Sequence, residues 1–126
     1  MDDTQYSCPV DAALSAIGGK WKMQILWRLV QRPHRYGELR RAIPEITEKM
    51  LYQQLRQLEA EKLVHREAYA EVPPRVEYSL TDRSEALIPI LNRMADWAFE
   101  HLDGRIEPSA PTKASLPEAV PDPADS

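Results

Sequence analysis

The spacing of apolar residues changes from a helical period to a strand-like one just after Leu63. Before that point, apolar residues recur every three or four positions, as in helices with one buried face. After it, Val76, Tyr78 and Leu80 alternate with polar residues, which is typical of a strand. The order predicts a mainly α-helical domain with one small β-hairpin.

Four helices are expected before the change of period. The first begins at Pro9, which suits a first helical turn because that position needs no N–H partner. The second begins near Lys20 and ends before Pro33, and a short third helix covers roughly residues 38–43. After a three-residue turn, a longer helix follows over residues 46–59. This arrangement is a helix-turn-helix.

The helix over residues 46–59 has two different faces. Its apolar face carries Leu51, Leu55 and Leu58 at positions i, i+4 and i+7, and Thr47 is well suited to cap its first turn. The opposite face carries side chains of types that bind phosphates and base edges in a major groove. These candidate DNA contacts are Lys49, Gln53 and Arg56, with Tyr52 at the flank. The alternative is an ordinary solvated helix face.

A hairpin directly after such a helix resembles a wing. Its strands are expected at Val64–Tyr69 and Val76–Leu80, joined by a loop that contains Pro73 and Pro74. Arg75, at the return of the loop, is the predicted wing contact with a minor groove or a phosphate. Three further candidate phosphate contacts, which a solvated role explains about as well, are Lys20, Arg40 and Arg41.

The last helix is expected to start after Thr81 and to run to about Leu102, with a bend near Glu85 because Pro89 removes a backbone N–H. Its apolar band is wider than a single contact requires, so a partner subunit is expected on the second side. The residues expected at that interface are Leu87, Leu91, Met94, Trp97 and Ala98. The alternative is that the first helix of the same chain covers this side.

Charge is distributed unevenly along the 126 residues. Residues 20–75 carry 12 Lys and Arg against seven Glu, a net charge of +5, whereas residues 1–19 carry −3 and residues 76–126 carry −6. A basic centre between acidic ends suggests a polyanionic partner. Residues 104–126 hold five of the 11 prolines and no apolar period, so we expect a disordered acidic tail there.

Several classes of protein are disfavoured. No run approaches the roughly 18 apolar residues of a membrane span, and the acidic start lacks the pattern of a signal peptide. The single cysteine, Cys8, excludes an internal disulfide and suits a reducing cytoplasm. The three histidines and Cys8 lie too far apart in sequence for a metal-ligand motif, and we find no cofactor motif and no catalytic motif. We therefore expect a protein that is not an enzyme, although a dimeric module that binds only protein remains an alternative.

Together, several short motifs resemble the HxlR-type winged helix-turn-helix transcriptional regulators of the MarR-like superfamily. They are Cys8-Pro9-Val10, Gly18-Gly19-Lys20-Trp21, Tyr36-Gly37-Glu38-Leu39, Lys49-Met50-Leu51, Gln54-Leu55-Arg56-Gln57-Leu58-Glu59, Val72-Pro73-Pro74-Arg75-Val76-Glu77-Tyr78 and Leu80-Thr81. The resemblance covers about residues 8–103, after an N-terminal extension over residues 1–7. Two positions depart from it: the family usually has glycine where this chain has Lys62 and Ser84.

The resemblance implies a cytoplasmic homodimer of a bacterium or archaeon that binds a palindromic operator in double-stranded DNA. It also implies dimerisation through the N- and C-terminal helices, which adds Leu14 and Ile17 to the expected interface. We expect a repressor, because a bound dimer easily occludes a promoter. Cys8 is a candidate sensor of oxidants or electrophiles, since some family members respond through a cysteine at this position. The alternative is a constitutive or small-ligand-controlled regulator without a cysteine switch.

Overall fold

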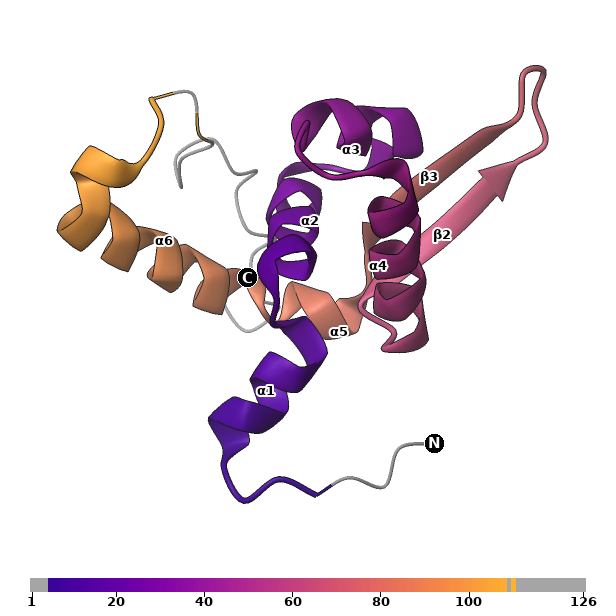
Figure 1. Ribbon diagram of the computed structural model, residues 1–126. Helices are drawn as coiled ribbons and strands as arrows, with labels where there is room; N and C mark the ends of the chain where they lie inside the picture. The colour runs from indigo at the N-terminus through magenta and orange to yellow at the C-terminus, as the bar shows by residue number, and fades with distance from the viewer. Residues whose placement is uncertain (1–4, 109, 111–126) are drawn as a thin grey trace, which may run out of the picture.

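The computed structural model describes residues 5–108 and 110. Its elements in chain order are α1 (Pro9–Ile17), α2 (Lys20–Gln31), β1 (His34–Arg35), α3 (Tyr36–Ala42), α4 (Glu48–Ala60), β2 (Val64–Tyr69), β3 (Arg75–Leu80), α5 (Asp82–Glu85), α6 (Ile88–Leu102) and the 3₁₀ turn η1 (Asp103–Arg105). Helices α2, α3 and α4 form a cluster, and the β2–β3 hairpin extends from it (Figure 1). The predicted winged helix-turn-helix fold is confirmed.

The core lies between the α2–α4 cluster and the base of the hairpin. Ile25 and Leu26 of α2 are almost fully buried, and so are Leu51 and Leu55 of α4. Each such side chain contributes about 1.5–3 kcal/mol by leaving water. The leucine stripe predicted for α4 is therefore the face that attaches this helix to the rest of the domain.

The sheet has three strands in the order β1-β3-β2, all antiparallel. Strand β2 pairs with β3 along its whole length, from Val64 opposite Leu80 to Tyr69 opposite Arg75. Strand β1 was not predicted. Its two residues pair with Tyr78 and Glu77 on the free edge of β3, so the sequence between α2 and α3 covers that edge.

The last helix is interrupted, not merely bent. Helix α5 ends at Glu85 and α6 begins at Ile88, with Pro89 in the first turn of α6. Proline has no N–H to donate to the carbonyl of Glu85, so a new helix starts where one continuous helix was expected. The predicted position was correct, but the prediction of one bent helix was wrong.

Helices α1 and α6 both extend away from the α2–α4 cluster (Figure 1). Both carry large exposed apolar side chains, listed here in chain order: Val10, Leu14, Ile90, Met94 and Trp97. Ile17 and Leu91, which were expected at a subunit interface, are instead buried in the core of their own chain at 8% and 5% exposure. The helical period correctly placed these residues on apolar helix faces. It could not predict which of them are buried within their own chain and which remain exposed.

Lys62 and Ser84, the two positions that depart from the family pattern, each have a distinctive local structure. Lys62 has φ of 61°, the left-handed conformation in which glycine is the favoured residue. The N–H of Lys62 donates to the carbonyl of Glu59, and that of Leu63 donates to the carbonyl of Leu58, which together close α4 in a Schellman motif. Ser84 is buried at the start of α5, where its hydroxyl accepts from the N–H of Thr81 at 2.9 Å.

Part of the predicted tail lies within the described residues. Asp103–Arg105 form η1, and Ile106 is partly buried after it. Residues 109 and 111–126, which make up most of that predicted tail, lie outside the described residues, as do residues 1–4 of the predicted extension. Within residues 5–108 and 110, no helix combines the length and apolar character needed to cross a membrane.

Candidate nucleic-acid interface

Helices α3 and α4 are fixed to each other at their first turns. The hydroxyl of Tyr36, the first residue of α3, donates to the carbonyl oxygen of Glu48, the first residue of α4, at 3.1 Å. Thr47 caps α4 as predicted, because its hydroxyl accepts from the N–H of Met50 at 3.1 Å. Ile46, in the turn itself, is buried. The turn therefore presents α4 at a defined angle to the domain.

The start of α3 is held by a carboxylate. Glu38 accepts from the backbone N–H of Arg35 at 2.8 Å and forms an ion pair with Arg32 at 3.3 Å. The hydrogen bond from Arg35, and then that from Arg32, lower the pKa of Glu38 below its ordinary value. The sequence-based estimate started this helix two residues too late, because Tyr36 and Gly37 carry no helical apolar pattern.

The exposed face of α4 carries the side chains that were predicted for it. Lys49, Tyr52, Gln53 and Arg56 are all exposed, and the Arg56 guanidinium lies 5.9 Å from the centre of the Tyr52 ring. Among the described residues, neither Lys49 nor Arg56 has a carboxylate within ion-pair distance. Their positive charges are thus available to a polyanion.

One residue of this face was missed. Gln57 is also exposed, and it lies one turn after Gln53 on the same side of α4. The spacing of four residues was a sufficient signal to include it. Its amide extends the row of hydrogen-bonding side chains by one turn towards the end of the helix.

The weaker phosphate candidates differ in their surroundings. Lys20 pairs with Glu45 at 3.8 Å and Arg40 pairs with Glu48 at 3.7 Å. Arg41 is exposed, and in the described part of the chain it has no acidic partner within ion-pair distance. Exposed pairs of this kind contribute only about 0–1 kcal/mol, so Lys20 and Arg40 exchange their partners at small cost.

Arg75 lies at the base of the wing loop, as the first residue of β3. Its guanidinium lies 4.0 Å from the centre of the Tyr69 ring and pairs with Glu71 at 3.3 Å and with Glu77 at 3.6 Å. Only 25% of the side chain is exposed. The predicted wing cation is therefore present but is already surrounded by groups of its own chain.

A groove of about 400 Å³ lies between α2 and α6. Its lining is mainly apolar and includes Met23 and Trp27 of α2 and Met94 and Phe99 of α6. Leu87 and Ala98, which were expected at an interface, are partly buried. Because Met94 lines the groove and is also half exposed, the groove opens directly onto the exposed apolar face of α6.

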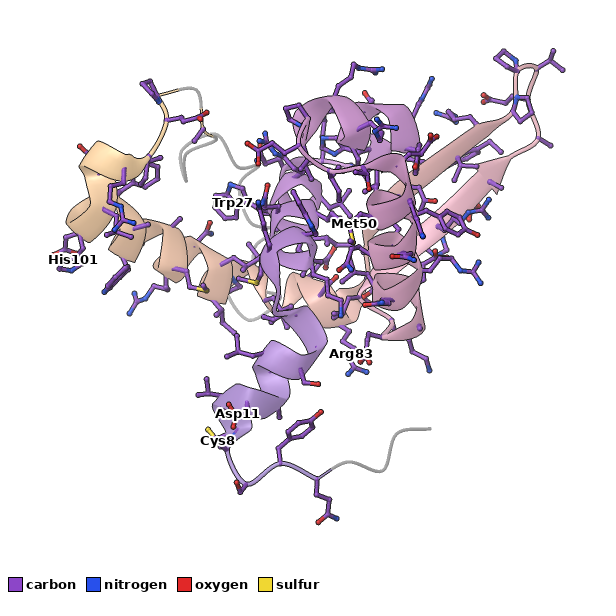
Figure 2. All side chains as sticks on the ribbon, in the orientation of Figure 1. Cys8, Asp11, Trp27, Met50, Arg83 and His101 are labelled. Carbon is purple, nitrogen blue, oxygen red and sulfur yellow. The ribbon has the colours of Figure 1, made fainter. Side chains whose placement is uncertain are left out.

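Cys8 caps the start of α1, and its carbonyl oxygen accepts from the N–H of Ala12 at 3.1 Å. Its side chain is partly buried and the thiol is free. Figure 2 places Cys8 beside Asp11 at the end of α1 that lies away from the α2–α4 cluster. Cys8 is thus distant from the exposed face of α4, and any influence on that face would have to act through α1.

The chain is similar to a known protein family and to several known regulators. A family model described as "HxlR-like helix-turn-helix" matches residues 16–105. A protein of Methanothermobacter thermautotrophicus, named an uncharacterized HTH-type transcriptional regulator, is 47% identical over 97 residues, which cover 77% of this chain and 74% of that protein.

Two solved structures are also similar. The redox regulator HypR in its oxidized form has a TM-score of 0.71 at 47% identity, covering 75% of this chain and 97% of that chain. The reduced form of the transcriptional regulator YodB from Bacillus subtilis has a TM-score of 0.68 at 32% identity, covering 80% of this chain and 100% of that chain. These proteins are regulators and not enzymes.

Proposed function

Because this chain belongs to the HxlR-like helix-turn-helix family and is a transcriptional regulator with a DNA-binding fold, we propose that it acts as a homodimeric repressor on a palindromic operator. The observation that carries the proposal is the exposed row of Lys49, Gln53 and Arg56 on α4. The opposite face of this helix is buried, so the helix is attached to the domain in one orientation only.

We assign different roles to the side chains of this row. Gln53 and Arg56 lie in the second and third turns of a helix that would enter the major groove, and each can form paired hydrogen bonds with one base. Lys49, at the start of the helix, is a point charge suited to a phosphate. Arg41 and the partly neutralised Lys20 and Arg40 supply further phosphate contacts around the turn.

The dimer rests on the apolar faces of α1 and α6. Val10 and Leu14 of α1, and Met94 and Trp97 of α6, are each at least half exposed in the single chain, and exposed apolar helix faces of this kind mark interaction sites. A two-fold axis through these helices would place two copies of α4 on successive major grooves, roughly 34 Å apart. A dimer of this kind requires an inverted repeat in the DNA. When bound there, it would block access of the transcription machinery to a promoter. The expected location is the cytoplasm of a bacterium or archaeon.

Selection of bound sequences from random duplex DNA tests this function. We expect an inverted repeat to be enriched and its affinity to fall steeply with salt, because cations of the protein displace condensed counterions. Footprinting should then place the repeat over a promoter. Failure to enrich any sequence, together with salt-independent binding, would exclude the proposed function and favour a module that binds only protein.

A redox response through Cys8 is a second proposal, supported by the similarity to HypR, whose name describes it as a redox regulator. With one cysteine per chain, peroxide would convert the thiol to a sulfenic acid with release of water. A small thiol such as glutathione would then displace a second water and leave a mixed disulfide. Addition of this bulky polar group at the start of α1 would disturb the dimer surface and alter the spacing of the two α4 helices.

The test measures operator affinity before and after treatment with peroxide and glutathione, in the wild type and in Cys8→Ser. We expect treatment to weaken binding in the wild type only, and mass spectrometry to locate the adduct at Cys8. An equal response in both proteins would place the sensor elsewhere. No response in either protein would favour the alternative, a constitutive or small-ligand-controlled regulator.

A further inference from the structure

The strongest feature that the proposed function does not use is the pair of carboxylates around the wing arginine. Nη2 of Arg75 lies 3.3 Å from Oε1 of Glu71, and Nη1 lies 3.6 Å from Oε2 of Glu77. One guanidinium between two carboxylates leaves a local net charge of −1. The base of the wing loop around Arg75 is therefore not electropositive, although it carries the cation that was predicted to contact DNA.

Arg75 differs from the other paired cations of this surface. Lys20 and Arg40 each have one carboxylate partner, and their side chains are 63% and 40% exposed. Arg75 is 25% exposed and has two partners. It also lies over the ring of Tyr69, as Lys20 lies over the ring of Trp21. A guanidinium that is partly screened from water and stacked on an aromatic ring holds its ion pairs more strongly than an exposed one does.

The two carboxylates are not equally easy to displace. Glu77 belongs to β3 and its side chain is 28% exposed, whereas Glu71 lies in the loop and its side chain is 50% exposed. Glu71 can therefore leave Arg75 by a local rotation in the loop, while Glu77 stays at the edge of the guanidinium. Of the two, Glu71 is the partner that a DNA phosphate could replace.

We infer that Glu71 competes with DNA phosphate for Arg75 and so limits the affinity of the wing for DNA. A carboxylate and a phosphate present the same kind of acceptor oxygens to a guanidinium. When the wing binds DNA, a phosphate has to replace the carboxylate of Glu71 on Arg75. This replacement contributes less to the free energy of binding than contact of a phosphate with an unpaired arginine would. In its paired position, Nε of Arg75 is buried without a hydrogen-bond partner among the described residues, so that position carries a cost of its own.

This inference depends on the proposed function, because it requires that the wing approaches DNA. Glu71→Gln removes the competing charge and keeps the size of the side chain. We expect the variant to bind a mixed-sequence duplex several-fold more tightly than the wild type. The slope of log affinity against log salt should also steepen by about two for a dimer, one released phosphate contact for each wing.

Removal of any carboxylate near DNA strengthens binding to some extent, so two controls are needed. Glu67→Gln removes the same charge from strand β2 of the wing, where Glu67 pairs with His65 and not with a proposed DNA contact, and measures this general effect. Glu71→Gln combined with Arg75→Gln measures what remains when the arginine is absent. Competition for Arg75 predicts that the gain from Glu71→Gln exceeds that from Glu67→Gln and disappears in the Arg75→Gln background. Circular dichroism should confirm that every variant is folded.

The other outcomes overturn the inference. An equal gain with and without Arg75 would mean that Glu71 acts only through general charge. Weaker binding by Glu71→Gln would mean that the carboxylate orients Arg75 for DNA and does not compete with it. Wild-type protein that binds this duplex without any salt dependence would exclude the proposed function itself, and with it the inference.

Discussion

Tyr36 and Glu48 join the two helices of the helix-turn-helix through a hydrogen bond of 3.1 Å, in which the phenol donates to the backbone carbonyl. The carboxylate of Glu48 also pairs with Arg40 of α3 at 3.7 Å. Burial, and then the nearby charge of Glu48, raise the pKa of Tyr36 above its ordinary value, so the phenol remains a donor at neutral pH. Two contacts from one residue thus set the direction in which α4 leaves the turn.

Tyr36→Phe removes the phenol hydroxyl, with its hydrogen bond to Glu48 and its interaction with Arg40, and keeps the ring. We expect a loss of about 0.5–1.5 kcal/mol in the free energy of unfolding, measured with urea. Tyr69→Phe is a matched control, because its hydroxyl has no hydrogen bond among the described residues. An equal loss in both variants would contradict the role assigned to Tyr36.

The exposed face of α4 should carry sequence preference. We expect Gln53→Ala or Arg56→Ala to lose about 1–3 kcal/mol at the selected operator and to relax the preference at one base pair. Lys49→Ala should weaken all sequences alike. Arg83→Ala serves as a control, because it removes a positive charge from α5, which begins beside the C-terminal end of α4. Unchanged operator binding in all three α4 variants would remove this face from the DNA.

Neighbouring positions on α6 should separate assembly from folding. Met94 and Trp97 are 50% and 57% exposed, whereas Leu91 is 5% exposed. We therefore expect Met94→Asp and Trp97→Asp to give folded monomers that lose operator binding, measured by sedimentation and circular dichroism. Leu91→Asp should unfold the chain, because it buries a charge in the core. A folded monomer at micromolar concentration in the wild type would exclude the dimer.

Lys62 is expected to reduce stability through its left-handed backbone. Glycine accepts a φ of 61° without the steric cost that a Cβ brings. Lys62→Gly should therefore raise the free energy of unfolding by up to about 1 kcal/mol. Lys62→Ala keeps a Cβ and should show no such gain, so an equal gain in both variants would mean that lysine's side chain, not its backbone, is unfavourable.

His34 should make stability depend on pH in the weakly acidic range. Burial lowers the pKa of this imidazole below its ordinary value of 6.5, partly offset by the hydrogen bond from Nδ1–H to the carbonyl of Arg32 at 2.8 Å. Below pH 6.5 the unfolded chain takes up a proton that the folded chain resists. The free energy of unfolding should therefore fall as the pH drops from 6.5.

His34→Gln is expected to flatten this dependence, which urea unfolding at several pH values can measure. The lowered pKa of Glu38 contributes stability that is lost only at more acidic pH, below its ordinary value of 4.5. The two groups therefore act in separate ranges. A slope between about pH 6.5 and 5 that is unchanged in His34→Gln would show that this histidine is not its source.

The elements with strong local signals were predictable from the sequence. Thr47 caps α4 and its leucine stripe faces the core, because a helix and its cap depend on residues three to four positions apart. The β2–β3 hairpin followed from alternation around a proline loop. The exposed Lys49, Gln53 and Arg56 followed from the same period, since the side opposite a buried stripe is exposed.

Other features depend on contacts that no local pattern records. Strand β1 has only two residues, and it exists because β3 offers a free edge beside it. Leu91 and Met94 belong to one apolar band, yet only the packing of the chain decides that Leu91 is buried and Met94 is exposed. The surroundings of Arg75 likewise depend on how the loop closes, since that closure brings Glu71 and Tyr69 to the same guanidinium. The period of a sequence determines which residues share a face, whereas the tertiary structure determines what covers that face and which charges meet.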